Sequence, residues 1–280
     1  MIQYQRKCNY VEILELETIA KELRVDIIRM LVKAGSGHPG GSLSCIDLVT
    51  TLFFHKMRHR PKEPDWSDRD RFVLSKGHCV PALYAALSRA GYFPRDELLT
   101  LRKLNSRIQG HPDRFRFPYL EASTGSLGQG LSMAVGMALA GKTSGKDYRV
   151  YCVISDGECQ AGQIWEAAMS AAKFELDNLC VMLDYNKIQL SGAIKDIMNI
   201  EPLLDKWKSF NWNTLEIDGH DFKAITESLE QAEGVKGKPT LILCQTLKGK
   251  GVSFMEGKWE WHGKAPNREE GEKAIQEILA

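Results

Sequence analysis

The sequence predicts an α/β fold in which a parallel sheet is covered by helices on both faces. Apolar segments of strand length alternate along the chain with amphipathic segments of helix length. The central strand candidates, 150–154 and 179–183, are apolar throughout. Strands of this kind are buried on both faces, which is typical of a parallel sheet between two helical layers. No internal repeat, low-complexity tract or linker is visible, so we expect residues 1–280 to form one domain.

Each element follows from its local pattern. Apolar residues at helical spacing predict a helix over 11–34, which ends at the glycine- and proline-rich loop 35–41. Ser44 is a candidate cap for the next helix, with Asp47 three residues on. A loop at 125–130 opens a small-residue helix over 131–140. The other expected strands span 71–74, 148–154, 179–184, 214–217 and 240–246, and the other expected helices span 81–90, 95–104, 161–175, 201–210, 221–233 and 268–279.

Bulk composition excludes several classes of protein. Lys and Arg total 37 and Asp and Glu total 36, a balance that argues against general nucleic-acid binding. No apolar run approaches the roughly 18 residues that span a bilayer, and the N-terminal residues lack the apolar core of a signal peptide. The seven cysteines are scattered and form no CxxC pair, so neither zinc nor a disulfide framework is expected. A reducing cytoplasm fits this cysteine content best.

An acid and an amide follow two neighbouring strand candidates. Asp156 comes directly after one apolar run and Asn186 shortly after the next. In an open parallel sheet, ligands lie beyond the carboxyl ends of the strands, where these oxygens could hold a hard cation such as Mg²⁺ together with the Ile188 carbonyl. The alternative, that Asp156-Gly157 is a simple turn and Asn186 a helix cap, remains open at this point.

Glycines, histidines and a lysine in loops point to an anionic ligand. Gly157 and the loop 125–130 would let backbone N–H groups approach an anion, although the poor strand before GSLGQG does not favour a dinucleotide motif. Lys248 follows the last strand candidate, whereas the neighbouring Lys250 and Lys258 are expected to be solvated. A single loop histidine is usually solvated too, but four lie in Gly- or Pro-rich loops: His38, His78, His111 and His262.

Eight motifs, taken in order, resemble the N-terminal half of transketolases. They are KAGSGHPGG, DRFVLSKGH, QGHPD, TGSLGQGLSMAVGMA, YRVYCVISDGE, WEAAM, LDNLCVMLDYNKIQ and WHGKAPN. The resemblance covers nearly the whole chain, and the ordered set is far more specific than any single motif. The stretch from Asp156-Gly157 to Asn186 is similar to the thiamine diphosphate signature of a wider enzyme class. The resemblance implies the fold that binds this cofactor.

The family implies a role for each matching residue. Mg²⁺ or Ca²⁺ would bind the oxygens of Asp156, Asn186 and Ile188. The cofactor diphosphate would contact His78, Gly157, Lys248 and His262. The thiazolium side of the cofactor would be lined by Gly125, Ser126 and Leu127. The sugar substrate would face His38 and His111, with His78 close to the reacting carbon. Glu166 would belong to a polar network between paired active sites.

Two positions depart from the family pattern. Ser155 replaces the first glycine of the usual Gly-Asp-Gly, a small change. Ala161 occupies the position, five residues after the metal aspartate, where the family usually has a glutamate. This second change puts communication between paired sites in doubt.

The implied activity is transfer of a two-carbon ketol unit from a ketose phosphate to an aldose phosphate. The C2 carbanion of the cofactor attacks a ketose, releases an aldose and passes the unit to another aldehyde. In full-length relatives a pyrimidine-binding domain follows this region, and we find none here. We therefore expect an N-terminal subunit that works with a separate C-terminal subunit, in an α2β2-type assembly, without nucleic acid or membrane partners. The alternatives are a split thiamine-diphosphate ligase acting on an unusual sugar or biosynthetic ketone, and a catalytically silent binding or regulatory module of the same fold.

Overall fold

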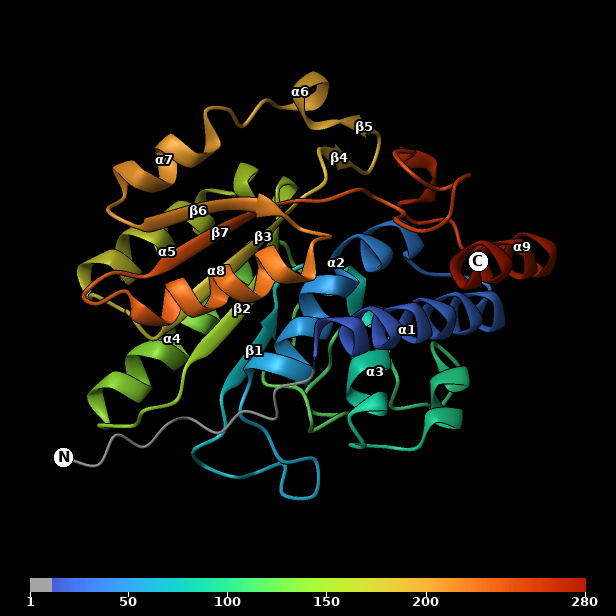
Figure 1. Ribbon diagram of the computed structural model, residues 1–280, viewed down its shortest axis with the longest axis horizontal. Coiled ribbons are helices and arrows are strands. Elements are labelled where there is room, and N and C mark those ends of the chain that lie inside the picture. The colour runs from blue at the N-terminus through green and yellow to red at the C-terminus, as the bar shows by residue number, and fades with distance from the viewer. Residues whose placement is uncertain (1–11) are drawn as a thin grey trace.

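Five parallel strands form the central sheet of the protein. The computed structural model describes residues 12–280. In the sheet the strand order is β1-β2-β3-β7-β6, and every neighbouring pair is parallel (Figure 1). The strands span Arg71–Leu74 (β1), Val150–Ser155 (β2), Leu179–Tyr185 (β3), Asn213–Asp218 (β6) and Thr240–Gln245 (β7). The predicted parallel sheet is therefore confirmed.

Helices cover both faces of the sheet, as the apolar central strands predict. Along β2, Tyr151 and Val153 join the core on one face, whereas Val150, Cys152 and Ile154 join the core on the other. The first layer comprises α1 (Ile13–Ala34), α2 (Pro39–Thr51), α3 (Val80–Arg89) and α8 (Phe222–Gly234), and α9 (Arg268–Leu279) packs outside α1. The second layer comprises α4 (Gln129–Thr143), α5 (Gly162–Lys173) and α7 (Leu203–Ser209).

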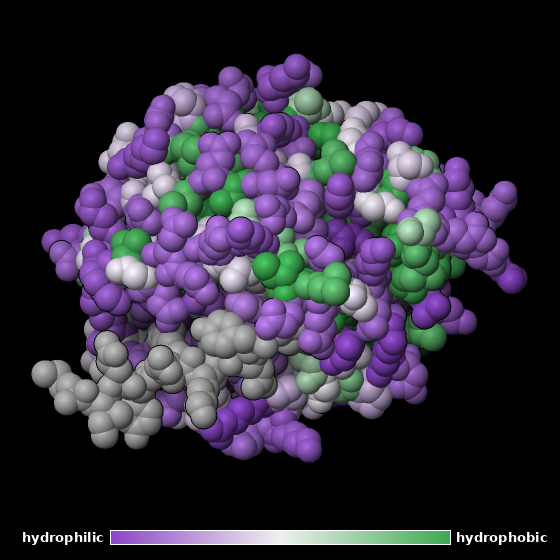
Figure 2. All heavy atoms as spheres, in the orientation of Figure 1, coloured by the Kyte–Doolittle hydropathy of each residue, from purple (hydrophilic) through white to green (hydrophobic). Residues whose placement is uncertain are grey.

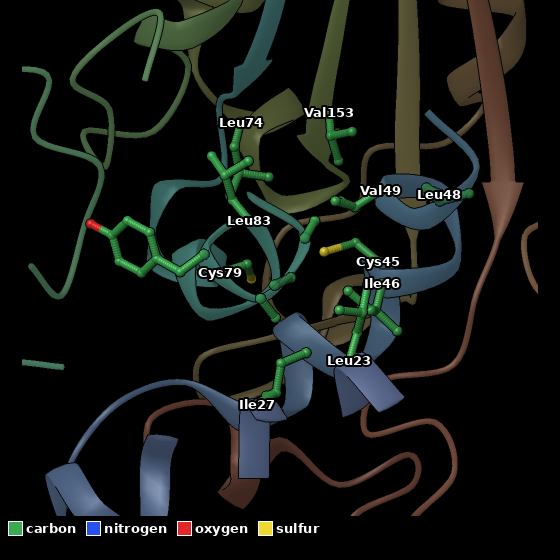
Figure 3. Packing of buried hydrophobic residues seen from close by; sticks show 14 of the residues in the cluster. Leu23, Ile27, Cys45, Ile46, Leu48, Val49, Leu74, Cys79, Leu83 and Val153 are labelled. Carbon is green, nitrogen blue, oxygen red and sulfur yellow. The ribbon is translucent and has the colours of Figure 1, made fainter. Parts of the chain in front are cut away.

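Figure 3 shows how closely the first layer packs. Two helices contribute side chains that extend toward Leu74 and Val153 of the sheet. These side chains are Leu23 and Ile27 of α1 and Cys45, Ile46 and Val49 of α2. The six described cysteines are free and buried. Within residues 12–280, no helix is both long enough and apolar enough to cross a membrane.

Two expectations about local structure are wrong. Ser44 does not cap a helix, because α2 already begins at Pro39, which is pre-organised for a first helical turn, and Ser44 lies buried inside it. The helix expected over 95–104 is only a short 3-10 helix, Arg95–Thr100. It ends there because Leu101 leaves the helical region, with ψ of 126°, and the next residue, Arg102, takes a left-handed conformation with φ of 59°.

Several short elements gave no clear signal in the sequence. A two-stranded hairpin, β4 (Ile188–Gln189) and β5 (Gly192–Ala193), leads into the single turn α6 (Ile194–Ile197). A π-helical segment, Leu52–Lys56, extends α2, and short 3-10 segments follow β1 and β2. The hairpin matters most for function, because it brings Ile188 to the edge of the sheet where the strands end.

Candidate functional site

A cavity of about 330 Å³ lies where the carboxyl ends of the strands meet the loops that follow them. Most of the residues singled out from the sequence line it: His38, His78, Gly125, Leu127, Asp156, Gly157, Asn186, Ile188, Lys248 and His262. Three of the predicted residues do not. His111 adjoins the cavity beside His38 and Gly125, Ser126 is exposed next to Gly125, and Glu166 is exposed on α5.

Asp156 and Asn186 lie at the ends of adjacent strands, one residue beyond β2 and β3 respectively. Asp156 accepts hydrogen bonds from the backbone N–H groups of Gly157 (2.8 Å) and Lys187 (2.6 Å). Burial, and then the nearby Asp184 carboxylate, raise the pKa of Asp156 to about 7. A cation in the cavity would oppose both effects, so this carboxylate is suited to a metal ion.

A buried ion pair next to these residues was not predicted from the sequence. Lys76 pairs with Asp184, and the two side chains are only 1% and 0% exposed. Asp184 also accepts from Ser44 Oγ at 2.5 Å, and Asn186 Nδ2 donates to Asp184 Oδ2 at 3.3 Å. Because the Asn186 amide nitrogen is engaged here, its oxygen is oriented away from Asp184. The only signals in the sequence were Lys76 in SKGH and Asp184 at a strand end.

Lys248 is buried among polar groups at the cavity wall, with 2% of its surface exposed. Its Nζ donates to the Ile188 carbonyl at 2.9 Å and lies 2.9 Å from His262 Nδ1. Burial, and then the positive charge of Lys76, lower the pKa of Lys248 to about 8. An anion in the cavity would restore the favourable environment for this ammonium group. The expectation that Lys248 is less solvated than its lysine neighbours therefore holds.

The four loop histidines form one cluster. The ring centroid of His38 lies 5.3 Å from that of His78, 6.0 Å from His111 and 5.6 Å from His262. Burial, and then His78, lower the pKa of His38 to about 4, and burial, and then Lys248, lower the pKa of His262 to about 3. Both imidazoles are thus neutral at pH 7, the form that can accept a proton.

Arg102 lies at the rim of this cluster, although no motif singled it out. A Cβ placed on Gly110 would lie 2.5 Å from Arg102 Nε, and one placed on Gly37 would lie 3.9 Å from it. The guanidinium therefore sits between the loops that carry His38 and His111. Burial first, and then Arg102, lower the pKa of His111.

Glu158 ties the loop before α4 to the end of β1. Its Oε1 accepts from Ser75 Oγ (2.6 Å) and Gly128 N (2.8 Å), and its Oε2 accepts from Ser155 N (2.9 Å). The side chain is fully buried. The carboxylate therefore holds the glycine loop beside the Asp156 turn and does not face the cavity.

The residues present fit a metal-bound diphosphate. A Cβ added at Gly157 would meet only Gln189 Cβ, at 3.9 Å, so the space in front of this glycine is open. His38 Nδ1 is buried and has no hydrogen-bond partner among residues 12–280. Within the same residues, no three His, Cys, Asp or Glu side chains are grouped to hold a metal. A carboxylate, an amide and a carbonyl are instead a partial oxygen set, and Mg²⁺ usually completes such a set with phosphate and water.

Comparison with known proteins shows the family to which the chain belongs. A sequence profile of the family described as "Transketolase, thiamine diphosphate binding domain" matches residues 16–279. The chain is 44% identical to the 6-deoxy-6-sulfo-D-fructose transketolase subunit SqwG of a Clostridium species, with 99% of this chain and 96% of that protein covered. It is 41% identical to an apulose-4-phosphate transketolase subunit of Phocaeicola vulgatus, with 96% of this chain and 94% of that protein covered.

Longer transketolases of known structure show the same likeness over part of their length. The solved transketolase of Campylobacter jejuni superposes with a TM-score of 0.90 at 34% identity, and the match covers 96% of this chain and 43% of that one. The transketolase of Leishmania mexicana gives a TM-score of 0.90 at 31% identity, covering 96% of this chain and 42% of that one. This chain therefore spans less than half the length of these enzymes.

Proposed function

Because the chain belongs to the family of transketolase thiamine diphosphate binding domains, we propose that it is the N-terminal subunit of a thiamine diphosphate-dependent transketolase. Its reaction is transfer of a two-carbon ketol unit from a ketose phosphate to an aldose phosphate. Two of its relatives are named as subunits of transketolases for a sugar phosphate and for a sulfo-sugar, which supports a substrate with an anionic end. Its location is the cytoplasm.

One observation carries the proposal: the Asp156–Asn186 pair and the Lys248 ammonium border the same cavity. The oxygens of Asp156, Asn186 and Ile188 would hold Mg²⁺ (or Ca²⁺). The diphosphate would be bound by His78, Gly157, Lys248 and His262, and Gly125, Ser126 and Leu127 would line the thiazolium side of the cofactor. Opposite charges therefore meet in pairs, metal with carboxylate and diphosphate with ammonium.

When bound, thiamine diphosphate supplies the nucleophilic carbon and the electron sink that carbon–carbon cleavage requires. The chain's own residues orient the sugar and handle protons. His38 and His111 face the sugar hydroxyls, and neutral His38 can accept a proton that its depressed pKa makes easy to return. His78 packs beside both His38 and His262, where it would be close to the reacting carbon. Glu166 belongs to the polar network between paired sites.

A C-terminal subunit with the pyrimidine-binding domain completes the active site, in an α2β2-type assembly. The matched relatives of similar length are named as subunits, which supports a second chain. Leu127 and Leu190 line the cavity yet are 47% and 64% exposed, as expected where another surface closes over them. A ligase acting on an unusual sugar or a biosynthetic ketone, and a silent binding module, are the alternatives to be tested.

The test is an assay of the two purified chains, together and apart, with thiamine diphosphate and Mg²⁺. A ketose phosphate and an aldose phosphate are supplied, and the products are separated by chromatography. Ketol transfer by the pair supports the proposal. Binding of the cofactor without transfer between any ketose and aldose would favour a silent module, and formation of a different carbon–carbon product would favour a ligase.

A further inference from the structure

A largely buried chain of hydrogen bonds, beside a second cavity of about 360 Å³, links three elements. Arg24 of α1 donates from Nη1 and Nη2 to the two carboxylate oxygens of Asp47 of α2, at 2.8 and 2.7 Å. His220, in the turn after β6, joins them through Nδ1, which lies 2.8 Å from Asp47 Oδ2. The three side chains are 9%, 3% and 14% exposed. None of them lines the cavity described above.

The hydrogen bonds define the tautomer of His220. The backbone N–H of Leu247 donates to His220 Nε2 at 2.9 Å, so Nε2 carries no hydrogen. The hydrogen of the neutral ring is therefore on Nδ1 and is donated to Asp47. Arg24, Asp47 and His220 thus form a continuous series that ends on the backbone of Leu247.

Leu247 directly precedes Lys248, and the segment around Lys248 is held at further points. Gly249 N donates to the Gly40 carbonyl at 2.9 Å, and Arg24 Nε donates to the Lys250 carbonyl at 3.4 Å. The Lys248 carbonyl accepts from Gly257 N at 2.9 Å. Arg24 and His220 therefore act on both sides of Lys248, whose side chain reaches the cavity wall.

We propose that Arg24, Asp47 and His220 are positioning residues that set the backbone of residues 247–250, so that the Lys248 ammonium faces the cofactor diphosphate. The proposal deepens the proposed function and rests on it. A flexible lysine places its charge accurately only when its backbone is fixed, because its side chain has four rotatable torsions. Buried ion pairs contribute little net stability compared with apolar packing, so a role in placement accounts better for three charged or polar groups at this point.

The test uses the full chain and isothermal titration with magnesium pyrophosphate as the probe. His220→Phe removes the acceptor for Leu247, and we expect a loss of affinity of about 10- to 100-fold, the range seen when groups that orient metal ligands are removed. His220→Gln keeps an acceptor and should recover part of the affinity. In a Lys248→Met background, His220→Phe should cause no further loss of pyrophosphate affinity, because His220 acts on the probe only by positioning Lys248.

His59→Phe is the matched control. His59 is a partly buried histidine with two hydrogen-bond partners, the Phe53 carbonyl (2.7 Å) and Tyr92 Oη (3.1 Å), and it lies outside the cavity. It should lose folding stability without losing pyrophosphate affinity. Equal losses of affinity in His59→Phe and His220→Phe would mean that His220 acts only through general stability, which overturns the proposal.

Two reference variants separate this inference from the proposed function. If Asp156→Ala and Lys248→Met bind the probe as tightly as wild type, the proposed function is wrong. If both lose affinity while His220→Phe does not, or if His220→Phe still weakens binding in the Lys248→Met background, the positioning role is wrong.

Should His220→Phe not fold, Asp47→Asn replaces it. Amide hydrogen exchange at Leu247 and Lys248 needs no ligand: it should speed up in either variant, and unchanged exchange contradicts the proposal.

Discussion

Asp156 is a buried carboxylate that lies near a second carboxylate, that of Asp184. It is 2% exposed, and burial and the Asp184 carboxylate both make its ionised form costly without a cation. The sequence allowed this residue and Asn186 to be predicted, because both follow apolar strands. It did not allow Lys76 and Asp184 to be assigned, because a buried charge is tolerated only beside its partner, and the pairing joins residues far apart in the chain.

Asp156→Ala should abolish productive cofactor binding. Loss of one member of a buried charge pair costs about 3–5 kcal/mol, which is roughly a hundredfold or more in Kd. Calorimetry on the assembled complex, with thiamine diphosphate and Mg²⁺, measures the loss. Asp221→Ala serves as the control, since Asp221 caps α8 by accepting from Lys223 N and Ala224 N. Unchanged affinity in Asp156→Ala would mean that the metal binds elsewhere.

Two histidines of the cluster, His38 and His262, should titrate far below the range usual for imidazole. His38 and His262 have pKa values of about 4 and about 3, so both should stay neutral as the pH falls from 8 to 5. An unfolded histidine binds its proton near pH 6.5. Because folded His38 and His262 do not bind one until the pH is much lower, they reduce the free energy of unfolding as the pH drops below 6.5. Asp156 acts in the opposite direction, because its raised pKa lets the folded state bind a proton first. Net stability is therefore a poor readout, and NMR titration of each imidazole is the direct one.

Arg102→Met offers a sharper test of the same cluster. Removing the guanidinium should raise the pKa of His111, and to a smaller extent that of His38, and should leave His262 unaffected. Arg116→Met, in an exposed loop, is the control for loss of one positive charge. NMR titration of the histidine Cε1–H signals compares the variants. An unchanged His111 titration would show that the guanidinium lies away from the ring in solution.

At the scale of elements, α2 shows how tertiary packing can override the structure that a local sequence pattern predicts. Pro39, Gly40 and Gly41 read as loop residues, yet they form the first turn of a fully buried helix. A Cβ on Gly40 would lie 2.9 Å from the Trp261 carbonyl, and one on Gly41 would lie 2.6 Å from Cys79 Sγ. Close packing thus requires glycines that helix propensity disfavours, and only the assembled layers reveal it. The sheet and the tail helix were predictable because their patterns agree with their packing.

Glu158 should be essential to how β1, β2 and α4 meet. Glu158→Gln replaces one accepting oxygen with an NH₂ group that faces a donor, and a buried donor left unsatisfied costs about 1–3 kcal/mol. The free energy of unfolding in urea should fall by that amount without a change in the m-value. Glu230→Gln, an exposed position on α8, should stay within about 0.5 kcal/mol of wild type. A Glu158→Gln protein as stable as that control would show that Ser75, Gly128 and Ser155 find other partners.

At the scale of the molecule, we propose that the chain carries one wall of an active site that a partner subunit completes. Figure 2 shows a mainly hydrophilic surface on which apolar side chains emerge in several separate places. Exposed apolar side chains also occur on α4 and α5, at Met133 and Met169. The single-domain expectation for residues 1–280 remains a prediction, and residues 1–11 lie outside the described part of the chain.

The purified chain alone should show no ketol transfer, and addition of the C-terminal subunit should restore it. The reason is that activation of the cofactor's pyrimidine ring depends on a domain that we assign to the partner. The measurement is turnover of a ketose phosphate and an aldose phosphate with thiamine diphosphate and Mg²⁺, with and without the partner. Lys258→Met, at an exposed position, is a control substitution that should leave the turnover of the assembled pair unchanged. Turnover by the single chain comparable to that of the pair would refute the two-subunit proposal.

Ala161 bears on how two sites in one assembly communicate. Its Cβ lies 3.2 Å from the position of a Cβ on Gly128, so it faces the start of α4. The side chain of alanine cannot carry a proton or accept a hydrogen bond. Glu158 is three residues away but cannot substitute, because its carboxylate is buried and already accepts from Ser75, Gly128 and Ser155. Within the described residues, neither Ala161 nor Glu158 therefore offers a free carboxylate at this point.

We therefore expect nearly independent cofactor binding at the two sites of an assembled complex. Calorimetry of thiamine diphosphate binding, with wild type and Ala161→Glu side by side, gives the stoichiometry and the cooperativity. The introduced glutamate has room only if it turns away from Gly128 and toward the partner surface, so Ala161→Gln serves as the control for size without charge. Coupling that appears in Ala161→Glu and not in Ala161→Gln would assign communication to the carboxylate. Strong negative cooperativity already present in wild type, and unchanged by Ala161→Glu, would show that other groups couple the sites.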